Sequence, residues 1–351
     1  MPKEDVLEIP ALINFEWILD ATKSGPAFSR ERLNQIIAIY EEVKDHGGTY
    51  EIVDLLGKKY EMTARPTYCI TERDGTLISM KIAVGYNSYQ NMAEEDDATV
   101  LDQRQAFPFA IWNSSDNHIQ HDCHGIAAQL NAWEEEWEKY KYRQDLIRHL
   151  EEHGPETAEV EQIVCFGLGY IGRPLDGSHY RRSYFQHLAA CTIRDCLEEQ
   201  HAKSLEQSPP RKIEIYAQDP SYCDKCRAEL REKHRIEVVE NPYGFAKVDK
   251  NTFVLTFSPD IPVRQIVADL TMEYQGPAGM LCDKIESDGL EYAVQSYNSN
   301  MDCTMSSYTT DPPSPNLAKY RDRCMVLSLN DKELPQQQQM FGRTALYLKK
   351  K

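Results

Sequence analysis

The chain has 351 residues, 41% of them apolar, and a formal net charge of −17, so it is long and apolar enough for one large or two unequal globular domains. Its 56 acidic against 39 basic side chains argue against nonspecific nucleic-acid binding. No apolar run approaches the roughly 20 residues of a membrane span, and residues 1–20 lack the pattern of a signal peptide. We therefore expect a soluble protein of the cytosol or nucleus, with no membrane partner and reduced cysteines.

The first 155 residues predict an α+β extension. Ser29 is placed to cap a helix over 30–44, which the pair Gly47-Gly48 ends. Asp74-Gly75 between two apolar runs, 68–70 and 77–82, indicates a hairpin. A further strand is expected over 106–112, at an edge because of Pro108.

One long polar helix is predicted over 125–153, with aromatic residues spaced among many charges. The sequence His153-Gly154-Pro155 after it combines a helix stop with a turn. We place the domain boundary there, with residues 1–155 as the extension and residues 156–351 as the second domain.

Strands and helices alternate after Pro155. Strands are expected over 163–166, 213–216, 236–239, 253–257 and 279–282, and helices over 184–199, 221–233 and 263–270. This alternation is typical of right-handed βαβ units, so an α/β fold with a mostly parallel sheet is predicted. We expect strand 163–166 at the centre of the sheet, and late strands over 324–329 and 345–348 at an edge.

A glycine turn follows the first of these strands. The run Q-I-V-C-F-G-L-G-Y-I-G carries Gly167, Gly169 and Gly172 at the spacing G-x-G-x-x-G, which is compatible with a bound dinucleotide. Six residues, 173–178, separate the third glycine from the next helix, unlike the usual nucleotide-binding loop. The alternative interpretation is a tight strand-to-loop turn without a ligand.

Several ordered motifs together resemble one family. They are V-C-F-G-L-G (164–169), Y-F-Q-H-L-A (184–189), I-E-I-Y-A-Q-D-P (213–220), V-V-E-N (238–241), F-V-L-T-F-S-P-D (253–260) and M-F-G-R-T-A-L-Y-L (340–348). This order is similar to the SRR-like family, named after a plant protein for sensitivity to red light reduced. The resemblance implies a Rossmann-like three-layer α/β sandwich. Residues 1–155 lie outside it and look like the extension of fungal members.

The resemblance also carries over individual positions. Gly167 and Gly169 match the strand-end glycines, Gln186 the helix glutamine, and Asp219-Pro220 the acidic turn after the second strand. Glu240 and Asn241 match as well. Where the family commonly has a proline followed by a histidine, this chain has Pro259-Asp260, so a role that needs an imidazole there is not expected.

Polar residues follow the carboxyl ends of the predicted parallel strands, which meet along one rim of such a sheet. These residues are Gly167, Gly169, Asp219, Glu240, Asn241, Ser258, Asp260 and Asp283. One interpretation is a ligand crevice, in which Asp219 accepts hydroxyl hydrogen bonds and the glycine turn holds an anion. The other is structural, with Asp219 starting an Asp-Pro turn and capping the next helix.

Two clusters contain cysteine. His118, His121, Cys123 and His124 are too close in sequence for a regular four-ligand site, and Cys223-Asp-Lys-Cys226 is a C-x-x-C pair without a second pair. Zinc, redox chemistry and ordinary thiols are the alternatives for the pair, and the expectation is no bound metal.

Two classes of function remain open. The family is linked to clock and light signalling in plants and to haem-related or cytoskeletal regulation elsewhere, so the resemblance implies a regulatory protein with a nucleotide-like or other small ligand and, plausibly, protein partners. The alternative is an enzyme on the same fold, such as a cofactor-dependent transferase or a tRNA-dependent cyclodipeptide synthase. No nucleophile motif or P-loop is present, and the sequence names no cofactor.

Overall fold

The computed structural model describes residues 7–10, 16–23, 25–71, 77–93, 106–115, 121–123, 125–174, 180–204, 212–290, 294–298, 303–305, 310–335 and 339–351. The Asp74-Gly75 turn, His118 and His124 lie outside these residues, as does the side chain of His121.

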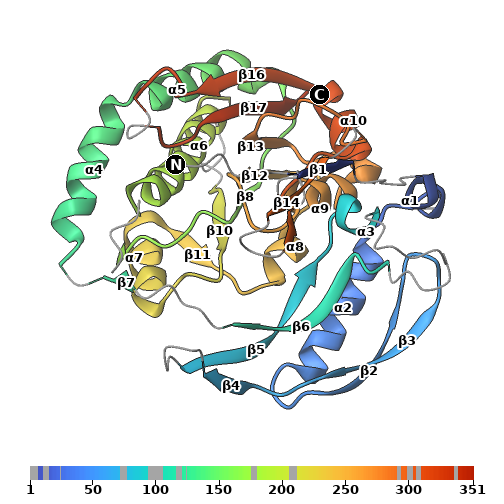
Figure 1. Ribbon diagram of the computed structural model, residues 1–351. Helices are drawn as coiled ribbons and strands as arrows, with labels where there is room; N and C mark the ends of the chain where they lie inside the picture. Colours follow the sequence, from blue (N-terminus) through green and yellow to red (C-terminus); the bar gives the residue numbers. More distant parts are fainter. Residues whose placement is uncertain are drawn as a thin grey trace.

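A seven-stranded sheet with the order β11-β10-β8-β12-β13-β17-β16 forms the centre of the molecule (Figure 1). Its strands are β8 (Gln162–Phe166), β10 (Glu214–Gln218), β11 (Ile236–Val238), β12 (Thr252–Thr256), β13 (Gly279–Asp283), β16 (Cys324–Asn330) and β17 (Arg343–Lys349). The first five are parallel, and β17 and β16 continue the sheet antiparallel. The predicted mostly parallel α/β sheet is thus confirmed, with β8 in the middle of its parallel part.

Helices cover both faces of this sheet, because alternate residues of each buried strand point to opposite sides. Ile163 and Cys165 belong to one core, shared with α4 (Ala127–Lys139), α5 (Lys141–His153), α6 (Tyr180–Ser204) and α7 (Asp224–His234). Val164 and Phe166 belong to the other, shared with the N-terminal elements and with α8 (Tyr243–Lys247), α9 (Val263–Leu270) and α10 (Pro315–Arg323). These four side chains of β8 are each at most 1% exposed.

The predicted single helix over 125–153 is wrong in one respect: it is two helices, α4 and α5, which break at Tyr140. Tyr140 has an extended backbone with ψ 128°, and its hydroxyl donates a 3.0 Å hydrogen bond to Asp331. Its ring also packs against Trp137 and Phe185. These tertiary contacts bend the chain around the sheet face, where α4 and α5 follow its outer side (Figure 1).

The N-terminal residues form α1 (Glu16–Ala21), α2 (Arg30–Val43), α3 (Tyr89–Ala93) and two small antiparallel sheets. These sheets are β2 (Gly48–Val53) with β3 (Lys59–Ala64), and β4 (Tyr68–Thr71) with β5 (Leu77–Tyr86) and β6 (Phe109–Ser115). The Ser29 cap and the β4-β5 pairing agree with the sequence predictions, and the strand expected over 106–112 is β6, at an edge and after Pro108. Figure 1 shows these elements gathered beside the main sheet.

Buried polar contacts attach this extension to the rest of the chain. Asp269 on α9 accepts hydrogen bonds from Phe28 N and the Tyr89 hydroxyl. Arg30, at the start of α2, donates to the carbonyls of Phe245 and Ala246 at the end of α8. The extension is therefore held against the α8-α9 face of the sheet.

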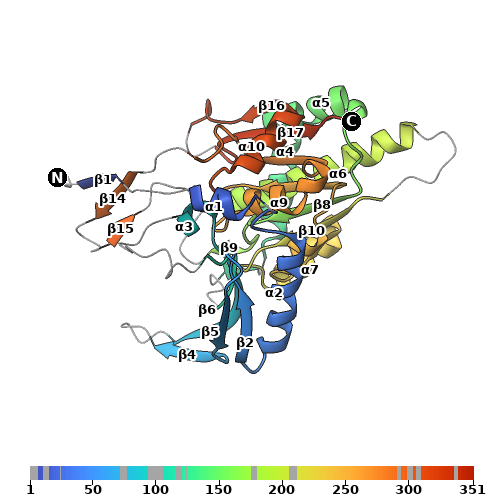
Figure 2. The same ribbon diagram turned by 90° about the vertical axis from the view of Figure 1, so that its right-hand side faces the viewer.

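Short strands complete the described structure. β7 (His121–Asp122) pairs with β9 (Arg173–Pro174), and β1 (Leu7–Pro10) pairs with β14 (Val294–Asn298), which also pairs with β15 (Cys303–Met305). Figure 2 shows β1, β14 and β15 projecting from the main body. No helix within the described ranges is long and apolar enough to cross a membrane.

Candidate functional site

A cleft of about 1180 Å³ opens at the carboxyl ends of β8, β10 and β12. Its floor comes from the loops after these strands and from α6. Its roof comes from the N-terminal extension, through α2, β5 and β6. Of the residues predicted from sequence, the structure brings eight together along this cleft: Gly167, Gly169, Gln186, Asp219, Glu240, Asn241, Ser258 and Asp260. Asp283 is not among the lining residues.

The glycine turn has the backbone conformation that its sequence predicts. Gly167 and Gly169 have φ values of +65° and +76°, which L side chains rarely adopt. Their amides are already used within the protein, because Gly167 N donates to Gln218 O at 3.1 Å and Gly169 N donates to Asp219 Oδ2 at 2.7 Å. These two amides are therefore not available to a phosphate, unlike those of a nucleotide-binding glycine loop.

Asp219 lies under the glycine turn and is 9% exposed. Its Oδ1 accepts a 2.8 Å hydrogen bond from Ser221 N, which makes the local turn expected of an Asp-Pro sequence. The cap of α7 is Cys223 rather than Asp219. Burial raises the pKa of the Asp219 carboxyl, and the nearby Asp260 carboxylate raises it further, while the bonds to Ser221 and Gly169 act in the opposite direction. Asp219 thus shapes the floor and carries a proton more readily than an exposed carboxylate.

Gln186 offers unused hydrogen-bonding groups at the same floor. It lies on α6 and is only 5% exposed, yet its amide makes no hydrogen bond with any described residue. The buried Ser183 Oγ, one turn earlier, also has no partner within the described chain. The amide atoms of Gln186 are not among the fully buried unpaired atoms of the described chain, so water or a ligand in the cleft can bind its two N–H donors and its carbonyl acceptor.

The guanidinium group of Arg182 also lines this part of the cleft. The Nε atom of Arg182 donates to Met340 O at 3.0 Å, and its two terminal nitrogens contact no acceptor in the described part of the chain. Arg182 is exposed and lines the cleft. It is therefore placed to bind an anionic group.

Asn241 and Glu240 also line the cleft. The Asn241 side chain joins floor to roof, since its Nδ2 donates to Val84 O at 2.8 Å and its Oδ1 accepts from the Tyr86 hydroxyl. Glu240 is exposed and forms an ion pair with Arg227. Asn241 thus has a positioning role in this structure, while Glu240 adds negative charge at the rim.

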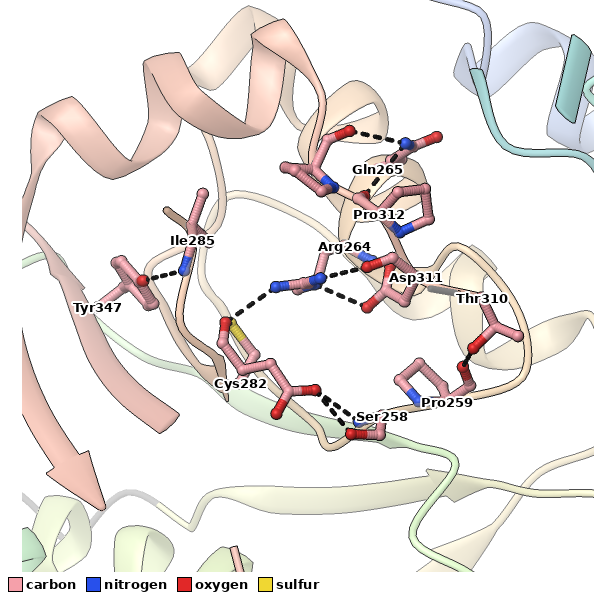
Figure 3. A network of polar contacts seen from close by, with 12 residues as sticks. Ser258, Pro259, Arg264, Gln265, Cys282, Ile285, Thr310, Asp311, Pro312 and Tyr347 are labelled. Carbon is pink, nitrogen blue, oxygen red and sulfur yellow. Dashed lines mark hydrogen bonds and ion pairs between the residues drawn. The ribbon is translucent and has the colours of Figure 1, made fainter. Parts of the chain in front are cut away.

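A buried network positions the loop that carries Asp260. Arg264 at the start of α9 binds Asp311 through Nε at 2.8 Å and the carbonyl of Asp283 through Nη1 at 2.9 Å (Figure 3). Asp283 in turn accepts from the amide and hydroxyl of Ser258, whose φ is +49°. Asp283 and Ser258 therefore hold the turn after β12 in shape, and Asp260, which is exposed, faces the cleft at its end.

The roof contains residues that sequence reasoning missed. Trp112 on β6 is 47% exposed and lines the cleft, with its indole lying against Gly85 so closely that a Cβ there would be 2.5 Å from the ring. Tyr40 and Lys81 line the same wall. An exposed tryptophan over a cleft is a surface on which flat rings stack. Trp112 lies at the cleft because β6 pairs with β5 beside the main sheet, and no local sequence pattern specifies this arrangement.

Three thiols meet next to this cleft. Cys123, after β7, lies 3.7 Å from Cys223 Sγ and 3.6 Å from Cys226 Sγ, and the last two are 3.6 Å apart. The sequence placed Cys123 and the C-x-x-C pair in separate clusters, and the fold brings them together. They are the described residues whose chemistry best suits a soft metal ion.

A family model describes a large part of this architecture. The model of the SRR1 domain matches residues 146–348, which is more than half of the chain. The chain belongs to the SRR1 domain family. The match begins within α5 and includes the cleft floor and the seven-stranded sheet except for Lys349, whereas the roof residues Tyr40, Lys81 and Trp112 precede it. The resemblance seen in the sequence is thereby confirmed. No curated protein and no solved structure matches the chain significantly.

Proposed function

We propose that this SRR1 domain protein binds a small, nucleotide-like organic ligand in the cleft and acts as a regulatory protein. The observation that carries the proposal is the Gln186 side chain, which is only 5% exposed, lines a large cleft and forms no hydrogen bond with any described residue. A site built to hydrogen-bond a ligand leaves such groups unused when the ligand is absent.

The other lining residues define the ligand's chemistry. Trp112 presents a ring face to a flat aromatic group, and Arg182 presents two free nitrogens to an anion. Asp260 and Glu240 at the rim favour hydroxyl or amino groups. A compound with a flat ring, hydroxyl groups and one anionic group fits all of these, and its anion would be held by Arg182 rather than by the Gly167 and Gly169 amides.

The domain that carries this cleft is, by the same proposal, a Rossmann-like three-layer sandwich of residues 156–351, with residues 1–155 as an extension of the fungal type that closes the cleft. The proposal implies that the protein acts as a regulator in the cytosol or nucleus and that its N-terminal extension is available to protein partners. The alternative, an enzyme, is favoured by one observation: the raised pKa of Asp219 beside Asp260, which suits proton transfer.

Co-purification and thermal shift test the proposal. Native mass spectrometry and an absorbance scan of the purified protein would identify a retained compound, and nucleotides, dinucleotides and haem form the panel for melting-temperature shifts. We expect a stabilising compound whose Kd rises roughly tenfold or more in Gln186→Leu, because a buried hydrogen bond is lost.

Two controls sharpen the result. Gln186→Glu keeps the shape of the side chain and one acceptor, and Gln144→Leu makes the same exchange at an exposed position of α5. Wild-type affinity in Gln186→Leu would refute the site, and a compound that leaves with altered mass after incubation would favour the enzyme.

A further inference from the structure

We propose that Cys123, Cys223 and Cys226 bind a zinc ion through their three sulfur atoms. The sulfurs form a nearly equilateral triangle with sides of 3.6, 3.6 and 3.7 Å. In a tetrahedral zinc site with Zn–S bonds of about 2.3 Å, neighbouring sulfurs are about 3.8 Å apart. The three thiols therefore already have the spacing of one face of such a tetrahedron.

The local structure at the C-x-x-C pair supports thiolate ligands. Cys223 is the N-cap of α7, and its Sγ accepts a hydrogen bond from the amide of Cys226 at 3.4 Å. Amide donors and the positive end of the helix dipole stabilise the negative charge that a metal-bound sulfur carries. Two cysteines three residues apart at a helix start also point to the same side, so a single ion can reach both.

Cys123 comes from a distant part of the chain and is brought in by ordinary secondary structure. It follows β7, whose residues His121 and Asp122 pair with Pro174 and Arg173 of β9. The cluster thus joins the segment before α4 to the first turn of α7, 100 residues later in the sequence. A shared ion would hold these two segments together beside Tyr222 and Cys223, which line the cleft.

The fold brings together more candidate metal ligands than either cysteine cluster offers in the sequence. Neither cluster alone supplies four well-spaced ligands, which was the reason to expect no metal, but the fold supplies three from the described residues alone. The fourth position is left to water or another exogenous ligand, as in zinc sites with three protein ligands. The proposal requires only the three sulfurs.

Metal analysis of intact protein without a polyhistidine tag, purified under reducing conditions without chelators, tests the proposal. We expect about one zinc per chain in the wild type and less than about a tenth in Cys123→Ser and Cys223→Ser. Cys196→Ser is the matched control, because Cys196 is also half-buried but lies on α6 outside the cluster. This variant should keep its zinc.

A second measurement uses only the folded wild type, in case the serine variants fold poorly. Titration with a thiol-binding mercurial should release zinc to a colorimetric indicator, and cobalt exchanged into the site should show thiolate charge-transfer and tetrahedral d–d absorption. The proposal is overturned if zinc-reconstituted wild type holds less than about a tenth of an ion per chain, if Cys223→Ser keeps its zinc, or if anaerobically alkylated protein shows a disulfide within the cluster.

Discussion

The backbone amide of Gly169 donates a 2.7 Å hydrogen bond to Asp219 Oδ2, and this contact joins the loops after β8 and β10. The second carboxylate oxygen of Asp219 accepts from Ser221 N at 2.8 Å. Both oxygens of one buried side chain are thus used to set the positions of two loops. These bonds preorganise the floor of the cleft. They also mean that the Asp219 carboxylate already accepts hydrogen bonds from the protein's own backbone.

Replacing Asp219 by alanine should lower the free energy of unfolding by about 1–3 kcal/mol, because it leaves two partly buried amides without acceptors. Urea denaturation measures this difference. Asp288→Ala is the control, since the exposed Asp288 also accepts from an amide two residues later, that of Leu290. A loss of a few tenths of a kcal/mol is expected there. Equal stability of the two variants would show that Asp219 has no special part in the floor.

Alanine at Gly169 should weaken ligand binding as well as stability. The residue's φ is +76°, and an added Cβ would lie 3.2 Å from Ser183 Oγ, beside Gln186. Gly57→Ala separates the two effects, because Gly57 has a φ of +80° but open space around its Cβ. Each variant should lose about 1–2 kcal/mol through backbone strain. Only Gly169→Ala should also reduce the thermal shift given by a bound ligand, and a parallel loss in both would contradict this.

Arg264→Met should destabilise the fold by about 3–5 kcal/mol, because it leaves the Asp311 carboxylate buried without its partner. The two side chains are 6% and 4% exposed. Arg343→Met breaks an ion pair with Glu286 in which both side chains are 53% exposed, and should cost less than about 1 kcal/mol. The double variant Arg264→Met, Asp311→Leu should recover much of the loss in chemical denaturation. No recovery would indicate that packing, rather than charge, dominates.

The protein should lose stability as the pH falls below about 6.5, in part through His187. Burial lowers the pKa of His187 to about 4. Its nitrogens contact Ser183 O and the Tyr222 hydroxyl, both at 2.7 Å. Between the unfolded pKa of about 6.5 and pH 4, the unfolded chain binds a proton at His187 that the folded chain does not bind. The stability that neutral His187 contributes is therefore present at neutral pH and lost towards pH 4.

His187→Gln should therefore show a smaller loss of unfolding free energy between pH 7.5 and pH 5 than the wild type, by roughly 2 kcal/mol. His46→Gln, at an exposed position, should follow the wild-type curve. His234, whose pKa burial also lowers to about 4, leaves a part of the pH dependence in both variants. Identical curves for His187→Gln and wild type would show that His187 titrates alike in both states.

The sheet could be predicted because the sequence signals for its strands are local. The apolar run of β8, the strand-helix alternation and the glycine turn each depend on neighbouring residues, and the alternation implies parallel strands joined by right-handed crossovers. The break at Tyr140 could not be predicted in this way. It depends on the hydroxyl bond to Asp331, nearly 200 residues later, and on ring contacts that no helical periodicity reports.

The residues of the candidate site also fall into two groups, those that local sequence indicates and those that it does not. Asp219 and Asp260 are found by reading strand ends, because parallel strands end at one edge. Gln186, on α6, was indicated only by the family resemblance. Trp112 and the meeting of Cys123 with Cys223 depend on how distant segments dock. The sequence therefore indicated no role for Trp112 beyond an expected strand, and it placed the cysteines in two separate clusters. The role of Asn241 is a further example: its bond to Val84 O makes it a link between roof and floor.

The cleft has two sources, a floor within the SRR1 domain match and a roof before it. Recognition of the proposed ligand is therefore composite. Grafting residues 1–145 from a different member onto this floor would exchange the stacking surface at Trp112 while leaving Gln186 and Arg182 in place. Selectivity for the flat part of a ligand can thus change independently of the groups that hold its polar end, and without any alteration to the sheet.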